Sequence, residues 1–294
     1  MTNRLATRLT TWKAWYAIPA FFAIVLASSV AVLGSFIPAE DAATRELINA
    51  LLVPAQFIVI ALLAVGFLAI VARRWPTTRD LGLRTKITGR EMGLLAIVFV
   101  VSHVLFWLLS KTAAADPGQA RRYFLEMDLA GPVAVAAASI VASAILAPVC
   151  EELLYRGAIL RPIHDHLARH GRAGLGVVAG ILASAAAFAM PHLGGSLTGA
   201  EAGSYLITGI AFGLVYVITG SMTAAMVSHS LQSFFVYAQI LIFGRGDDYV
   251  SPIIWIIALG CPLWTYLCAR ALHAVFPKGN DTRDAVGEAA YASN

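Results

Sequence analysis

Residues 147–157 read Ala-Pro-Val-Cys-Glu-Glu-Leu-Leu-Tyr-Arg-Gly, so two adjacent glutamates and an arginine directly follow an apolar run. If this stretch is helical, Glu152 and Arg156 lie one turn apart on the same face, with the acid before the base. Glu151 lies about 100° around the helix from Glu152. We therefore expect Arg156 to hold Glu152 and to leave Glu151 free for chemistry. The alternative is a glutamate pair at a cytoplasmic helix end, with an arginine that extends toward the membrane surface.

Composition indicates a polytopic membrane protein. Of the 294 residues, 59% are hydrophobic and 13% are charged, whereas a soluble domain carries about 25% charged residues. Apolar runs that can cross a bilayer must be helical, because lipid cannot satisfy free backbone amides. We expect about eight such spans in an all-α transmembrane bundle. They cover approximately residues 14–37, 47–72, 93–110, 131–150, 174–191, 204–218, 222–243 and 252–272.

The loops between these runs predict the topology. The N-terminus, segment 73–90 and segment 153–173 are basic, and positive loops face the cytoplasm. We therefore expect an integral protein of the cell membrane with both termini in the cytoplasm. Residues 1–278 are expected to form one domain, and the polar residues 279–294 a disordered cytoplasmic tail. The net charge of +4 is small and gives no sign of a nucleic-acid partner.

Polar residues interrupt two later runs as well. Phe188 and His192 are four residues apart at the end of the fifth run, and His229 and Ser233 have the same spacing in the seventh. Helical spacing places each pair on one face, and Gln232 follows His229 by three residues. A single histidine in an apolar helix is more often structural. His164, His166 and His170 lie in a basic segment and are expected to be solvated.

The chemistry open to such residues is limited. The chain has no Gly-x-Ser-x-Gly elbow and no His-Glu-x-x-His zinc helix. A carboxylate assisted by histidines can activate water, while amide or cationic donors stabilise an oxyanion. We expect no cofactor. The alternative is a zinc ion held by Glu151, His192 and His229.

Three motifs in this order resemble the CPBP family. They are Glu151-Glu152-x-x-x-Arg156, Phe188-x-x-x-His192 and His229-x-x-x-Ser233, and the resemblance covers approximately residues 80–240. The family comprises type II CAAX prenyl endopeptidases and bacteriocin-processing or bacteriocin-immunity proteins, also called Abi proteins. The resemblance implies an all-helical intramembrane glutamate-dependent endopeptidase.

The resemblance also implies roles for single residues. Glu151 would be the general base, supported by Glu152 and Arg156. His192 would bind or polarise the water, and His229 would contribute to the oxyanion site. The family's third motif usually ends in Asn, where this chain has Ser233, and Gln232 offers a longer donor one residue earlier. Phe188, Gln232 and Ser233 are therefore the candidates for substrate or oxyanion contacts.

The leading hypothesis is an endopeptidase that cleaves a hydrophobic or membrane-tethered peptide or protein tail. Prenylated CAAX protein ranks lower as a substrate, because the high alanine content and short loops suggest a prokaryotic inner or plasma membrane. A non-catalytic binding or immunity protein is the alternative, and the Ser233 departure favours it. A proton-coupled transporter is a third hypothesis, weakened by the lack of repeat halves. The loops also place Glu151 and His192 at opposite ends of their spans, a conflict because catalytic partners must share one depth.

Overall fold

The structure, a computed structural model, describes Leu5 and residues 9–111, 118–192 and 199–278. Within these ranges it contains helices and no strands. The α-helices are α1 (Ala17–Ser35), α2 (Ala42–Ala72), α3 (Thr78–Leu81), α4 (Gly89–Ser110), α5 (Gln119–Glu126), α6 (Val133–Val141), α7 (Ala147–Glu152), α8 (Arg161–Arg169), α9 (Ala173–Ala189), α10 (Gly199–Thr219), α11 (Met222–Gln239) and α12 (Pro252–Val275). Shorter 3₁₀ or π segments are η1 (Ala14–Tyr16), η2 (Ala142–Leu146), η3 (Leu153–Leu160), η4 (Met190–His192) and η5 (Ile240–Gly244).

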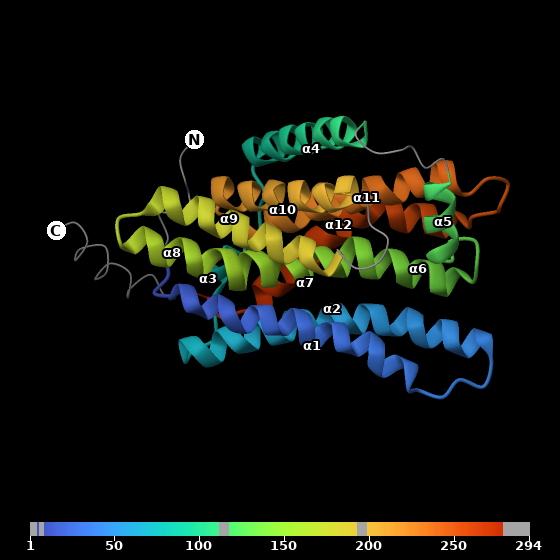
Figure 1. Ribbon diagram of the computed structural model, residues 1–294, viewed down its shortest axis with the longest axis horizontal. Helices are drawn as coiled ribbons and strands as arrows, with labels where there is room; N and C mark the ends of the chain where they lie inside the picture. Colours follow the sequence, from blue (N-terminus) through green and yellow to red (C-terminus); the bar gives the residue numbers. More distant parts are fainter. Residues whose placement is uncertain (1–4, 6–8, 112–117, 193–198, 279–294) are drawn as a thin grey trace.

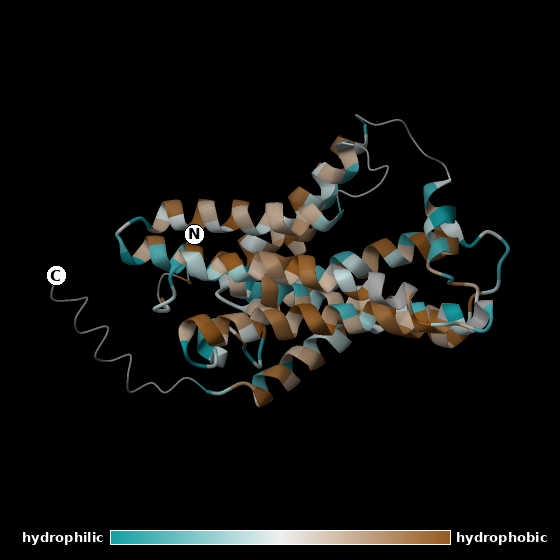
Figure 2. Ribbon diagram, turned by 60° about the horizontal axis from the view of Figure 1, so that its bottom comes forward, coloured by the Kyte–Doolittle hydropathy of each residue, from teal (hydrophilic) through white to brown (hydrophobic). Residues whose placement is uncertain are grey.

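The prediction of a polytopic helical membrane protein is confirmed. Seven helices of the described ranges are long and apolar enough to cross a membrane, and Ala14–Ala27 is a shorter apolar helix. The long helices run side by side, with the α1–α2 pair on one flank and α4 on the opposite one (Figure 1). Hydrophobic residues cover much of the helices, and hydrophilic residues concentrate toward their ends and connections (Figure 2). This distribution suits a bundle surrounded by lipid.

The central helix is longer than the sequence suggested. One continuous helix of 37 residues runs from Val133 to Arg169. The predicted span 131–150 therefore ended too early, and most of the predicted basic loop 153–173 is helical. Because the helix continues past the glutamates, Glu151 and Glu152 lie near its middle and not at its end. This removes the predicted conflict of depth with His192.

Pro148 shapes this helix next to the glutamates. Proline has no N–H, so the carbonyl of Ala144, four residues earlier, loses its helical donor. The π-helical turn η2 directly precedes this point. The free carbonyl accepts a hydrogen bond from the hydroxyl of Ser230 on α11, at 2.6 Å. Thr265 on α12 donates to the Ser230 oxygen at 2.9 Å, so the break in one helix joins three.

The register of α9 places its motif opposite the glutamates. A Cβ added to Gly176 would lie 2.8 Å from the His164 carbonyl oxygen, so α9 and α8 pack backbone against backbone there. The two helices are antiparallel. Phe188 follows Gly176 by twelve residues and Glu152 precedes His164 by twelve, so equal rises bring them to the same level.

Helix α10 approaches α9 as closely. A Cβ on Gly209 would lie 2.8 Å from Ala185 Cα, a distance that real side chains do not reach. The spacings Gly176/Gly180 and Gly209/Gly213 are typical of close packing between membrane helices, and here this packing operates on both faces of α9. The Gly209 carbonyl is thereby brought to the bundle interior, where it accepts a hydrogen bond from Arg156 at 2.7 Å.

Helices α10 and α11 form the tight antiparallel hairpin expected from the short gap between the runs 204–218 and 222–243, although α10 begins at Gly199 and not near 204. Their turn is held by the connector between α2 and α4. The Met222 amide donates to the Gly82 carbonyl at 2.9 Å, and the Tyr216 hydroxyl donates to the Leu81 carbonyl at 3.0 Å. Thr223 Oγ1 exchanges two hydrogen bonds with the backbone of Arg84. The connector therefore fixes the hairpin that carries His229.

One histidine prediction is wrong. His166 and His170 are partly or fully exposed, but His164 is completely buried. Its Nδ1 lies 2.7 Å from Asp165 Oδ1, and Arg161 and the Thr10 amide both donate to Asp165 Oδ2. The reason is the length of the central helix, which turns a supposed loop into a packed helix end that anchors the N-terminal segment.

The remaining shorter features follow the sequence in part. Helix α5 packs crosswise over η5 through the buried side chain of Phe124 (Figure 1). The predicted disordered tail, 279–294, lies outside the described residues. Cytoplasmic termini and the single-domain boundary stay predictions.

The close approach at Gly209 leads to a stability prediction. Gly209→Ala forces α10 away from α9 and should destabilise the protein by about 1–3 kcal/mol. Gly66→Ala is the matched control, because a Cβ on Gly66 in α2 meets nothing within 4 Å. It should be neutral or slightly stabilising. Unfolding temperatures of the two variants in detergent test this, and equal shifts would contradict the packing argument.

Asp80 in α3 predicts a pH dependence. Burial acts to raise the pKa of Asp80, but hydrogen bonds and charge from Arg74 and hydrogen bonds from Thr77 outweigh it and lower the pKa. Stability from this carboxylate is therefore full above the unfolded pKa of about 3.9 and lost as the pH falls through the folded pKa. Asp80→Asn should lower stability at pH 7 by about 1–3 kcal/mol and flatten the loss of stability that the wild type shows below about pH 5.

The control for this prediction is Asp41→Asn. Asp41 caps α2 with its carboxylate on the Thr44 amide, and asparagine caps a helix as well as aspartate does. Thermal unfolding across pH compares the two variants. An Asp80→Asn protein with the wild-type acid profile would show that Asp80 does not provide this stability.

Candidate active site

Glu152 is the centre of the polar cluster inside the bundle. Both it and Arg156 are completely buried, and Arg156 Nη1 donates to Glu152 Oε1 at 2.9 Å. The same oxygen lies 3.0 Å from Nδ1 of His229 on α11. The pairing of Glu152 with Arg156 expected from their spacing is therefore present. Glu152 Oε2 has no hydrogen bond to any described residue.

Arg156 is enclosed as well as paired. Its second terminal nitrogen donates to the Gly209 carbonyl, and its guanidinium lies over the rings of Tyr155, Phe188 and Phe212, at 5.4–5.9 Å from the centroids. Arginine suits such a site because its planar cation bonds and stacks at the same time. Four elements, η3, α9, α10 and α11, are thereby gathered around Glu152.

Glu151 is in a different situation. It is buried, with 8% of its surface exposed, and makes no hydrogen bond with the described residues. His229 Nε2 lies 3.9 Å from Glu151 Oε2. That distance is too long for a direct hydrogen bond. The two neighbouring carboxylates are therefore unlike, one fixed and one free to engage another molecule.

The second motif lies beside the first. The Phe188 ring is 5.5 Å from the His229 ring and 5.4 Å from the His192 ring, so it separates the two histidines. His192 Nδ1 lies 2.9 Å from the Phe188 carbonyl oxygen, and the His192 ring stacks on Tyr205 at 4.1 Å. A carbonyl only accepts, so Nδ1 carries the hydrogen and Nε2 is left as an acceptor.

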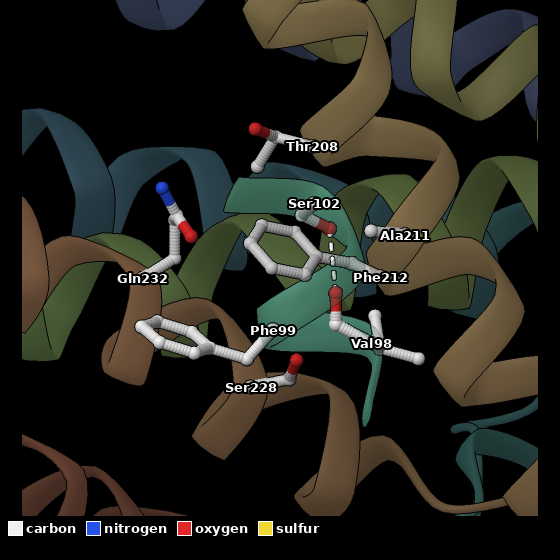
Figure 3. Close-up of a pocket in the computed structure, with 8 residues that line it drawn as sticks. All are labelled: Val98, Phe99, Ser102, Thr208, Ala211, Phe212, Ser228 and Gln232. Carbon is white, nitrogen blue, oxygen red and sulfur yellow. Dashed lines mark hydrogen bonds between the residues drawn. The ribbon is translucent and has the colours of Figure 1, made fainter. Parts of the chain in front are cut away.

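A small hollow adjoins this cluster between α4, α10 and α11 (Figure 3). It has room for about one water molecule. Phe212 lines it and also stacks on His229 at 4.5 Å, so this ring is the wall between the hollow and the carboxylates. The polar lining comes from Ser102, Thr208, Ser228 and Gln232.

Gln232 and Ser233 differ in their position. The Gln232 amide reaches into the hollow and has no hydrogen bond to the described residues (Figure 3). Ser233 does not line the hollow. Of the two candidates for the place of the family asparagine, Gln232 lines the hollow and Ser233 does not.

Several residues of the cluster were not expected. Phe212, Tyr205 and the Gly209 carbonyl contact the motif residues but carry no local signal, because apolar rings and glycines are common in membrane helices. Ser230 could have been found, since a hydroxyl directly after His229 and a proline inside an earlier span together suggest a carbonyl in need of a donor.

A metal site in this cluster would need several ligand side chains close enough to share one ion. No group of three or more His, Cys, Asp or Glu side chains in the described ranges is arranged to hold a metal ion. Glu151, His192 and His229, the residues of the zinc alternative, therefore do not form such a group. The expected absence of a cofactor stays a prediction.

The fold and this cluster define a polytopic helical membrane protein with a buried pair of carboxylates, one held and one free, flanked by two histidines. Residues 133–235 match the model of a family described as type II CAAX prenyl endopeptidase Rce1-like. The predicted resemblance to the CPBP family is thereby confirmed over the segment that carries all three motifs. No curated protein and no solved structure matches the chain significantly.

The difference between the two carboxylates predicts different mutant stabilities. Glu152→Gln leaves the buried Arg156 unpaired and should cost about 3–5 kcal/mol. Glu151→Gln is its isosteric neighbour and should change stability by less than about 1 kcal/mol, because it breaks no hydrogen bond among the described residues. Thermal unfolding of both variants in one detergent decides this. Equal destabilisation would mean that both carboxylates are structural.

Proposed function

We propose that this chain is an intramembrane endopeptidase in which Glu151 activates the attacking water. The observation that carries the proposal is the unequal treatment of the two glutamates. Glu152 is neutralised and immobilised by Arg156 and His229, whereas Glu151 is buried with no hydrogen-bond partner among the described residues. A general base has to keep a lone pair free for the proton it removes.

The residues around Glu151 support a hydrolytic reaction. In this mechanism Glu151 takes a proton from water as the water oxygen attacks the scissile carbonyl carbon. His192 Nε2, an acceptor, holds the second hydrogen of that water. The Gln232 amide donates to the oxyanion that forms, a role that the family asparagine fills and that Ser233 is too short to fill. Arg156 compensates the charge of the two carboxylates without contacting the substrate.

The substrate class follows from where these groups lie. They are inside a bundle of apolar spans and not on an exposed loop, so the peptide has to be presented at or within the membrane. We propose a hydrophobic peptide, a C-terminal sorting tail or a small secreted precursor, in a prokaryotic plasma membrane.

The test is proteolysis in liposomes with a library of membrane peptides read by mass spectrometry. The wild type should cleave defined peptides with or without a chelator. Glu151→Gln should lose at least about 10²-fold in kcat/KM, the range expected for removal of a general base, while it unfolds at the wild-type temperature. Full activity of a well-folded Glu151→Gln protein would refute the proposal.

Two other outcomes are informative. Loss of wild-type cleavage on chelation, restored by zinc, would replace water activation by Glu151 with a metal mechanism. Intact peptide binding without cleavage by either protein would support the binding or immunity alternative, with Ser233 in place of asparagine as the structural reason.

A further inference from the structure

We infer that His229 is the proton shuttle of this site, which carries the proton removed by Glu151 to the leaving nitrogen of the substrate, and that Glu152 is the positioning residue that fits it for this task. The inference rests on the proposed peptidase function. It differs from the role implied by family resemblance, in which His229 would contribute to the oxyanion site.

The first step of the argument is the tautomer of His229. Glu152 Oε1 accepts a hydrogen bond from Arg156 and lies 3.0 Å from His229 Nδ1. A carboxylate held by a guanidinium offers only lone pairs, so Nδ1 has to carry a hydrogen. That hydrogen stays in place in both charge states of the ring. Proton exchange on His229 is therefore confined to Nε2.

The second step is the direction of that nitrogen. Nε2 faces Glu151, at 3.9 Å from Oε2. The ring cannot turn freely, because Phe212 stacks on one side at 4.5 Å and Phe188 meets it edge-on at 5.5 Å. In the neutral ring Nε2 can accept the proton that Glu151 carries, and in the protonated ring the same nitrogen can pass that proton on.

The third step is the proton balance of peptide hydrolysis. Glu151 takes one proton from water, and the C–O bond forms to give a tetrahedral intermediate. The proton passes from Glu151 to Nε2 and then to the leaving nitrogen, because an amide nitrogen cannot leave as an anion. The C–N bond breaks to give an amine and a carboxylic acid, and Glu151 and His229 return to their starting states. No other reactant is required.

A carboxylate, a histidine and a reacting group in this order form a catalytic arrangement that recurs on unrelated folds. A buried acid on Nδ1 fixes the ring and stabilises its cation, and Nε2 does the transfer. Here Glu152 has this supporting role, and Arg156 and the Gly209 carbonyl hold Glu152 in turn. The two adjacent glutamates thereby act on opposite sides of the His229 ring. Glu152 holds Nδ1, and Glu151 delivers the proton to Nε2.

The leaving group distinguishes a proton shuttle from an oxyanion donor. A thioester in place of the scissile amide leaves as a thiolate, whose conjugate acid has a pKa of about 8.5, and needs no protonation. His229→Gln keeps a hydrogen-bond donor but cannot carry a proton. It should lower kcat/KM about 10²–10⁴-fold for a peptide that the wild type cleaves, and less than about 10-fold for its thioester analogue. Equal losses on both substrates would overturn the inference.

The controls separate this inference from the proposed function. His103→Gln changes another histidine of the bundle, which bonds the Phe99 carbonyl and packs on Phe235, and should leave both substrates unaffected. Glu151→Gln should abolish cleavage of both, and if it does not, the proposed function fails first. Glu152→Gln should impair the amide more than the thioester, a ratio that a purely structural defect would not change.

A measurement on the unmodified protein covers the case in which His229→Gln does not fold. If a proton is delivered to the leaving nitrogen during the slow step, heavy water should slow the wild type more on the amide than on the thioester. Equal solvent isotope effects on the two substrates would contradict the shuttle.

Discussion

The buried ion pair of Glu152 and Arg156 is the interaction on which the rest of the site depends. Neither side chain reaches the surface, and a single charge left alone at this depth would be very costly. Arg156 fastens the pair to α10 through the Gly209 carbonyl, and Glu152 extends it to α11 through His229. The close contacts at Gly176 and Gly209 bring the backbones near enough for these bonds. The close packing of the bundle and the geometry of the polar cluster therefore depend on each other.

An offset of a single residue gives the two glutamates different surroundings. Four residues further along the helix, Glu152 has Arg156 as its neighbour and Glu151 has Tyr155. Tyr155 is buried and carries no positive charge. The same offset directs Glu152 toward Nδ1 of His229 and Glu151 toward Nε2. Two chemically identical side chains are thus separated into one that is held by other residues and one that is not.

The sequence predicted those features that depend on local spacing. The apolar runs, the α10–α11 hairpin, the Glu152–Arg156 pair and the faces of α9 and α11 all follow from helical periodicity. It failed where a polar run continues a helix. Residues 153–169 look like a basic loop, but their charges are neutralised at a packed helix end, as Arg161 is by Asp165. The rings around Arg156 and the choice of Gln232 over Ser233 depend on contacts between distant segments, which spacing does not specify.

Pro148 weakens the central helix locally and at the same time frees a carbonyl that holds α11 in place. Proline inside a helix is usually treated as a weakness, and its replacement by alanine as a routine way to strengthen the segment. Here an alanine amide would compete with the Ser230 hydroxyl for the Ala144 carbonyl and loosen the contact that holds α11, and His229 with it, against the glutamates. The strength of this helix on its own and the precision of the site it carries are opposed, so a variant selected only for resistance to heat would be drawn away from the geometry that the polar cluster requires.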